Sequence, residues 1–132
     1  MHQVRLFLTN TILNDSVEVN SINNIDLEEC PNAIVQKIIG GKWALRILHN
    51  LSTGMLRFGK LNRQMPEITQ ATLTKELRRL EGFQLIKRKV YPEVPPRVEY
   101  SLTEIGMKLV PALKELEIWG EEFKKYVKRK QM

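Results

Sequence analysis

Apolar side chains recur every three or four positions along most of the chain after residue 30, and this spacing predicts amphipathic helices. The first predicted helix covers residues 31–39, with Pro31 in its first turn and the Gly40-Gly41 pair as its stop. A second, strongly apolar helix runs to Leu51, and a third ends before Pro66. The positions expected to form the buried face of the first helix are Ala33, Ile34, Val35, Ile38 and Ile39.

Residues 69–81 predict a fourth helix with two chemically different sides. Thr69 is a good N-cap, Gly82 ends the helix, and leucines follow one inward stripe at positions 73, 77 and 80. At 100° per residue, the opposite side and its flanks are polar or cationic. These outward and flanking residues are Ala71, Thr72, Thr74, Lys75, Arg78 and Arg79. They indicate either a solvated helix surface or a surface that contacts an anion.

The second half of the chain predicts a hairpin and a long helical end. Two β-like runs, 85–91 and 97–102, flank the proline-rich segment 92–96. Thr103 then caps a helical region that extends to about residue 129, in which Pro111 marks either a kink or the first turn of a new helix. The short run 55–58 predicts a small strand or a turn, and residues 1–25 fit a strand, an arm or a loosely held extension equally well.

Length and charge narrow the class of protein. The chain has 132 residues, of which 42% are hydrophobic and 27% charged, as expected for one globular domain. Residues 1–30 carry one basic and five acidic side chains, whereas residues 31–132 carry 20 basic and 10 acidic ones. Such a basic excess favours a polyanionic partner, nucleic acid or anionic lipid. We therefore expect an N-terminal extension, 1–29, and one domain, 30–132.

Several other classes are disfavoured. One cysteine and two histidines provide no disulfide framework, no metal site and no nucleophile–base pair, so we expect no metal, no cofactor and no enzyme. The Gly40-Gly41-Lys42 run lacks the upstream glycine of a phosphate-binding loop, and Trp43 follows the lysine. No segment approaches the ~20 apolar residues of a membrane span, and the start is a poor signal peptide. We expect a cytoplasmic protein without a membrane partner.

The order of the elements predicts the fold class: mainly α with a small β-hairpin (α+β), arranged as a winged helix-turn-helix. Helix 69–81 would then enter the major groove of double-stranded DNA, and the hairpin of about 85–102, the wing, would lie on the backbone or in a minor groove. The base-reading candidates are Thr69, Gln70, Ala71, Thr72, Thr74, Lys75 and Arg78. The backbone or wing candidates are Lys42, Arg79, Lys89 and Arg97, with Lys42 fitting a structural turn equally well.

The sequence also resembles a known family over residues 30–120. The resemblance rests on Cys30-Pro31, residues 39–43, Arg57-Phe58 with Leu61, residues 73–81 and, above all, YPEVPPRVEYSLTEIG at 91–106. These segments resemble the HxlR family of bacterial winged-helix transcription regulators. The resemblance implies a dimeric repressor or activator whose terminal helices pack together. The family usually begins close to the cysteine, and here some two dozen further residues precede that point.

Cys30 has two interpretations. It precedes a helix whose positive dipole end would favour the thiolate, while Glu28 and Glu29 would favour the neutral thiol. Several proteins of the HxlR family, which this sequence resembles, sense oxidants or electrophiles through a cysteine at the corresponding position. A redox sensor and an inert residue that packs at the helix start both remain open, and no effector is indicated.

Apolar residues along the last helix form a stripe that fits either an intramolecular core or a dimer interface. We favour a homodimer on a roughly palindromic operator, because a single domain of this size leaves a long terminal helix uncovered. The interface candidates are Ile34, Ile38, Leu109, Leu113, Leu116, Trp119, Phe123 and Tyr126. The alternative function is a winged-helix module for protein or RNA contacts, and the cations at 75, 78 and 79 argue against it.

Overall fold

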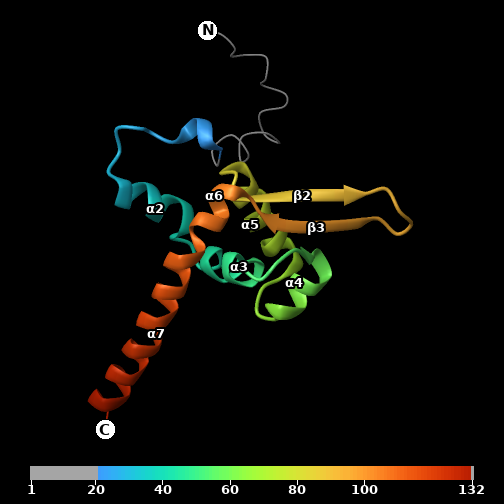
Figure 1. Ribbon diagram of the computed structural model, residues 1–132. Coiled ribbons are helices and arrows are strands. Elements are labelled where there is room, and N and C mark those ends of the chain that lie inside the picture. Colours follow the sequence, from blue (N-terminus) through green and yellow to red (C-terminus); the bar gives the residue numbers. More distant parts are fainter. Residues whose placement is uncertain (1–20, 132) are drawn as a thin grey trace.

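The computed structural model describes residues 21–131, so the predictions for residues 1–20 lie outside the described part. A short 3₁₀ turn, η1 (Ile22–Asn24), precedes the helices and strands of the domain (Figure 1). In chain order these are α2 (Pro31–Ile39), α3 (Ala44–Leu51), β1 (Leu56–Arg57), α4 (Phe58–Gln64), α5 (Gln70–Gly82), β2 (Ile86–Tyr91), β3 (Arg97–Leu102), α6 (Glu104–Lys108) and α7 (Val110–Lys130). The predicted fold class, mainly α with a small sheet, is confirmed.

The predicted hairpin forms one side of a small antiparallel sheet with the strand order β1-β3-β2. Strands β2 and β3 pair in register from Ile86 opposite Leu102 to Tyr91 opposite Arg97, so residues 92–96 form the tip of the wing. The short run at 55–58 contributes β1, whose Arg57 lies opposite Glu99. This pairing fixes the base of the wing beside the start of α4.

The leucine stripe of α5 lies in the core, as its spacing predicted. Leu73, Leu77 and Leu80 are at most 1% exposed. They pack with buried residues of α3, α4 and the sheet in one hydrophobic cluster. Burial of this stripe fixes which side of α5 faces solvent, because residues on opposite sides of a helix cannot both face the core.

The last helical region is two helices rather than one kinked helix. The side chain of Thr103 caps α6 by accepting the backbone N–H of Gly106 at 3.1 Å. Leu109 then separates α6 from α7, and Pro111 lies in the first turn of α7, where its missing N–H costs no helical hydrogen bond.

Helix α2 differs from the prediction of a buried face. No residue of α2 is fully buried, and Val35 is 47% exposed. Only Ile38 and Ile39 pack against the edge of the core, because the body of the domain meets the C-terminal end of α2 rather than its length. Trp43, which follows α2 and Lys42, is also only partly buried and packs against the core from outside.

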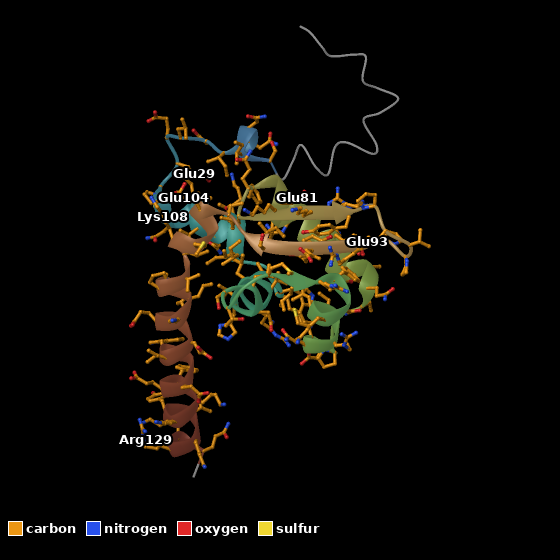
Figure 2. The ribbon with its side chains drawn as sticks, turned by 45° about the vertical axis from the view of Figure 1, so that its right-hand side comes forward. Glu29, Glu81, Glu93, Glu104, Lys108 and Arg129 are labelled. Carbon is orange, nitrogen blue, oxygen red and sulfur yellow. The ribbon has the colours of Figure 1, made fainter. Side chains whose placement is uncertain are left out.

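Two elements extend from the body on opposite sides (Figure 1). The wing extends on one side, and α7 extends away from the body on the other, with α2 beside the junction of α6 and α7. Figure 2 places Glu93 at the outer end of the wing and Arg129 at the far end of α7. The tip of the wing and the far end of α7 therefore lie on different sides of the body.

Gly106 holds α6 against the start of the sheet, and we expect Gly106→Ala to destabilise the fold by about 1–3 kcal/mol. A Cβ at this position would overlap the carbonyl oxygen of Leu85, which already accepts the Thr103 N–H at 3.0 Å. Gly120→Ala on α7 is the matched control, since a Cβ there meets nothing within 4 Å and should stabilise by about 0.5–1 kcal/mol. Urea unfolding compares the two variants, and equal midpoints would contradict the close approach.

Candidate nucleic-acid interface

Helix α5 begins with a cap that occupies two of the predicted base-reading side chains. The Thr69 hydroxyl oxygen accepts the Thr72 backbone N–H at 3.1 Å, and its O–H donates to the Thr72 Oγ1 atom at 2.9 Å. The cap orders the first turn of the helix and fixes where the helix begins. Thr69 and Thr72 therefore order the start of α5, and their base-reading role stays a prediction, as it does for the other candidates on this helix.

The outer side of α5 is open and cationic. Gln70, Ala71, Lys75 and Arg78 are exposed, and Thr74 is half-buried. Within residues 21–131, no carboxylate lies within 4.0 Å of the Lys75 or Arg78 nitrogen atoms. This surface thus presents one short aliphatic side chain, one hydroxyl group, one amide group and two cations together. These groups can match the donors, acceptors and thymine methyl groups of a major groove.

Tyr100 of β3 lies at the junction of α5 and the wing. Burial raises the pKa of its hydroxyl, and the cations of Arg88 and Arg78 partly oppose that rise. Glu81 raises this pKa as well, and it pairs with Arg88 at 3.8 Å. Side chains of α5 and of β2 thus act on the same hydroxyl at this junction.

Arg79 does not face outward as a phosphate-binding side chain would. Only 15% of its side chain is exposed. Its Nη2 atom donates to the Ile38 carbonyl oxygen at 2.8 Å, and its Nη1 atom donates to the Lys37 carbonyl oxygen at 3.3 Å. The structure thus places Arg79 against α2, whereas the neighbouring Arg78 is exposed, and the backbone contact expected of Arg79 stays a prediction.

On the wing, the side chains of Lys89 and Arg97 differ in the number of contacts that they make. The Arg97 guanidinium lies 3.8 Å from the centre of the Tyr91 ring and pairs with Glu93 at 3.1 Å and Glu99 at 3.7 Å. Lys89 is exposed, and its Nζ atom lies 4.9 Å from the centre of the same ring. Lys89 is therefore the less engaged cation, whereas Arg97 mainly stabilises the end of the hairpin.

A cationic surface on α4 escaped the sequence analysis. Arg57, Lys60 and Arg63 line one surface hollow together with Met55, Leu56 and Gly59. Arg57 also borders a second hollow, which reaches Glu93 and Arg97 on the wing. The signal was present as three cations at a spacing of three residues, which places them on one side of a helix. They extend the basic surface from the wing to α4.

Lys42 lies immediately before α3 and is exposed. Its Nζ atom lies 4.9 Å from the centre of the Trp43 ring, whose other neighbour is the Arg46 guanidinium at 5.4 Å. Arg46 in turn pairs with Glu67 at 2.8 Å, and this bond is the main reason that the pKa of Glu67 is lowered. In the described part of the chain Lys42 forms no ion pair, and its contact with a phosphate stays a prediction.

Cys30 is exposed at the start of α2. Its carbonyl oxygen accepts the backbone N–H groups of Ala33 at 2.9 Å and Ile34 at 3.1 Å, while its side chain makes no capping hydrogen bond. The neighbouring Glu29 is drawn to Lys37 at 3.2 Å. Both interpretations of Cys30 remain predictions, but the thiol is accessible to a reagent in this arrangement.

The predicted interface stripe of α7 divides into two parts. Leu113 is 5% exposed and belongs to the core, and Leu109 and Ile38 pack against that core. The stripe then continues into solvent on the extended part of α7, with an exposure of 47% for Leu116, 62% for Trp119 and 47% each for Phe123 and Tyr126. The rings of Trp119, Phe123 and Tyr126 stack in sequence at 5.2 and 5.8 Å. Ile34 of α2 is half-buried.

Among residues 21–131, no three His, Cys, Asp or Glu side chains are arranged to hold a metal ion. None of the helices within these residues has both the length and the apolar character of a membrane span.

The helix pair α4–α5, the cationic outer side of α5 and the hairpin together define a winged helix-turn-helix protein of the transcription-regulator class. A model described as HxlR-like helix-turn-helix matches residues 38–128. The chain belongs to this family, as the sequence resemblance predicted.

Similar proteins agree with this class. A relative from Methanothermobacter thermautotrophicus, named an uncharacterized HTH-type transcriptional regulator, is 50% identical over 94 residues, which cover 71% of this chain and 72% of the relative. The reduced form of the redox regulator HypR is 39% identical with a TM-score of 0.72, over 76% of this chain and 99% of that one. The reduced form of the transcriptional regulator YodB from Bacillus subtilis is 33% identical with a TM-score of 0.63, over 72% and 94% of the two chains.

Proposed function

We propose that this protein is a homodimeric, sequence-specific DNA-binding transcription regulator. Helix α5 would lie in the major groove of double-stranded DNA, with the wing and α4 on the flanking backbone. The single observation that carries this proposal is the outer side of α5, where Lys75 and Arg78 are exposed and form no ion pair with any carboxylate of residues 21–131. A surface made for an apolar protein partner would instead present apolar side chains.

Within this proposal, the groups divide by what they contact. Gln70, Ala71, Thr74, Lys75 and Arg78 are the proposed base-reading residues. The proposed phosphate contacts are made by Lys42, Lys89, Arg57 of β1 and the α4 cations Lys60 and Arg63. Phosphate contacts fix the position of the protein on the duplex, and base contacts supply the sequence preference.

The homodimer is proposed from the continuity of the α7 stripe. Leu113 of this stripe is covered by the core of its own subunit, while Leu116, Trp119 and Phe123 have no cover in one subunit. Leu116 also lines a cavity of about 300 Å³ between α3 and α7, beside Leu45 and His49. A second copy related by a two-fold axis would cover both the stripe and the cavity mouth. The operator would then be roughly palindromic.

Selection of bound duplexes from a random pool tests the proposed function. The full chain should enrich one motif made of two inverted half-sites, because two copies of α5 related by a two-fold axis read opposite strands. A pool that stays random after repeated rounds would contradict sequence-specific binding. Enrichment of single-stranded RNA in a parallel selection would favour the alternative RNA-binding module.

A redox response through Cys30 is a second proposal, supported by the exposure of its thiol and by the similarity to HypR, which is named a redox regulator. The chain has one cysteine, so oxidation would join it to a small thiol or to a second copy. The rate of alkylation of the native protein, compared with that of a free model thiol, tests the proposal. Faster labelling is expected for a sensor, and equal or slower labelling would refute it.

A further inference from the structure

Arg79 joins the proposed recognition helix to the C-terminal end of α2. Its Nη1 and Nη2 atoms donate to the carbonyl oxygens of Lys37 and Ile38 at 3.3 and 2.8 Å. Its Nε atom pairs with Glu76, one turn earlier on α5, at 3.3 Å. The guanidinium lies 5.8 Å from the centre of the buried Phe83 ring. All parts of this side chain are therefore engaged within the domain.

The two carbonyl groups have no partner within their own helix. The last four carbonyls of a helix lack intrahelical donors, and a cation near them also interacts favourably with the helix dipole. The Gln36 carbonyl accepts the Gly40 N–H at 2.8 Å, but those of Lys37 and Ile38 receive Arg79. A guanidinium can reach two such oxygens at once because its donors form a rigid planar fork.

Apolar packing alone holds α2 weakly. None of its nine residues is fully buried, and only Ile38 and Ile39 pack against the edge of the core. The two hydrogen bonds from Arg79 therefore link α2 to α5 in a defined orientation, which apolar contacts alone do not fix. Arg79 follows directly after Arg78 along α5, so a small rotation of α5 that breaks this link also turns the base-reading side.

We propose that Arg79 is a positioning residue for DNA reading. Burial of the leucine stripe determines which side of α5 faces solvent, and the Arg79 guanidinium ties that helix to α2, so that small shifts of α2 alter the exact orientation of the base-reading side. This inference rests on the proposed function, and it assigns to Arg79 a role distinct from a phosphate contact. A displacement of α2, whose first turn follows Cys30, reaches the recognition helix through this side chain.

Hydrogen exchange in the absence of DNA tests the link itself. Arg79→Gln removes the fork and the charge, and the amides of residues 34–40 should then exchange about tenfold faster. Arg78→Gln is the matched control, since its side chain lies on the same helix and makes no bond to α2; exchange in α2 should remain as in the wild type. Unchanged exchange in Arg79→Gln would overturn the proposal.

DNA binding by the same variants separates positioning from a phosphate contact. Arg79→Gln should lower the preference for the selected operator over random duplex and leave the salt slope of binding unchanged. A lost phosphate contact would lower both affinities equally and reduce the slope by about one per subunit. That result would overturn the proposal, and so would an unchanged preference, which would show a merely structural link.

Arg79→Lys keeps the positive charge but lacks the planar fork of donors. It provides a second test if Arg79→Gln fails to fold. It should behave as Arg79→Gln does, and restoration of the operator preference by lysine would overturn the proposal. Coupling is reciprocal, so operator binding should slow exchange in α2 of the wild type but not of Arg79→Lys. A wild type with no operator preference would refute the proposed function, while exchange without DNA would still report whether Arg79 holds α2.

Discussion

The double variant Trp119→Ser with Phe123→Ser is expected to sediment as a folded monomer and to bind the operator about 10²–10⁴-fold more weakly. The two rings stack on the extended part of α7, 62% and 47% exposed, where one subunit does not cover them. A dimer places the second copy of α5 at a high effective concentration beside its half-site, and a monomer loses that gain. Neither ring belongs to the core, so the fold should survive.

The matched control for this variant is Lys114→Ser with Glu121→Ser. Both residues are exposed on the side of α7 opposite the stripe, and their charges cancel. Analytical ultracentrifugation and operator binding should find this control indistinguishable from the wild type. A Trp119/Phe123 variant that still sediments as a dimer would show that the stripe is not the interface. Truncation before residue 108 is a poorer test, because it also removes Leu113 from the core.

Arg78→Ala is expected to lose most of the preference for the operator over random DNA. An arginine that binds guanine with two hydrogen bonds contributes about 1–3 kcal/mol of discrimination, or about 5–150-fold for each half-site. The affinity for random duplex should fall much less, because the variant loses a contact with a base and keeps its contacts with the DNA backbone. Fluorescence anisotropy with both duplexes measures the ratio directly.

Lys89→Ala supplies the contrast on the wing. Lys89 is exposed, whereas Arg97 is held by Tyr91, Glu93 and Glu99, so that Arg97→Ala would also disturb the hairpin. Lys89→Ala should lower both affinities by a similar factor, preserve their ratio and reduce the salt slope by about one per subunit. If Lys89→Ala abolished the preference and Arg78→Ala preserved it, the wing would be the base-reading element.

The sequence predicted α5 well because local signals there agree. Its N-cap, its leucine spacing and its final glycine all fall within residues 69–82, and burial of the stripe then determines the outward side. The hairpin was equally clear, since its proline-rich tip separates two β-like runs. The sequence left two alternatives at Pro111, because a kink and the first turn of a new helix share the same residue pattern. In the structure, α6 ends before Leu109 and Pro111 lies in the first turn of α7.

Contacts between distant segments could not be predicted. On a helical wheel, Arg79 and Thr72 both flank the outer side of α5, and only the position of α2 shows that Arg79 binds it. The buried side expected for α2 failed for a related reason, because its apolar spacing does not reveal how little of the helix the core reaches. Gly106 gave no signal either, since its close neighbour, the Leu85 carbonyl, belongs to another element.

The central claim is that this chain recognises a specific DNA sequence, and the ratio of operator to random-duplex affinity in the wild type tests it most directly. Measured by anisotropy at about 50 and 200 mM salt, both affinities should fall steeply as salt rises, because phosphate contacts release counterions. The operator should remain favoured by about 10³-fold or more at the higher salt. A ratio near one at both salt concentrations would contradict the claim and leave only a basic surface that binds polyanions without selection.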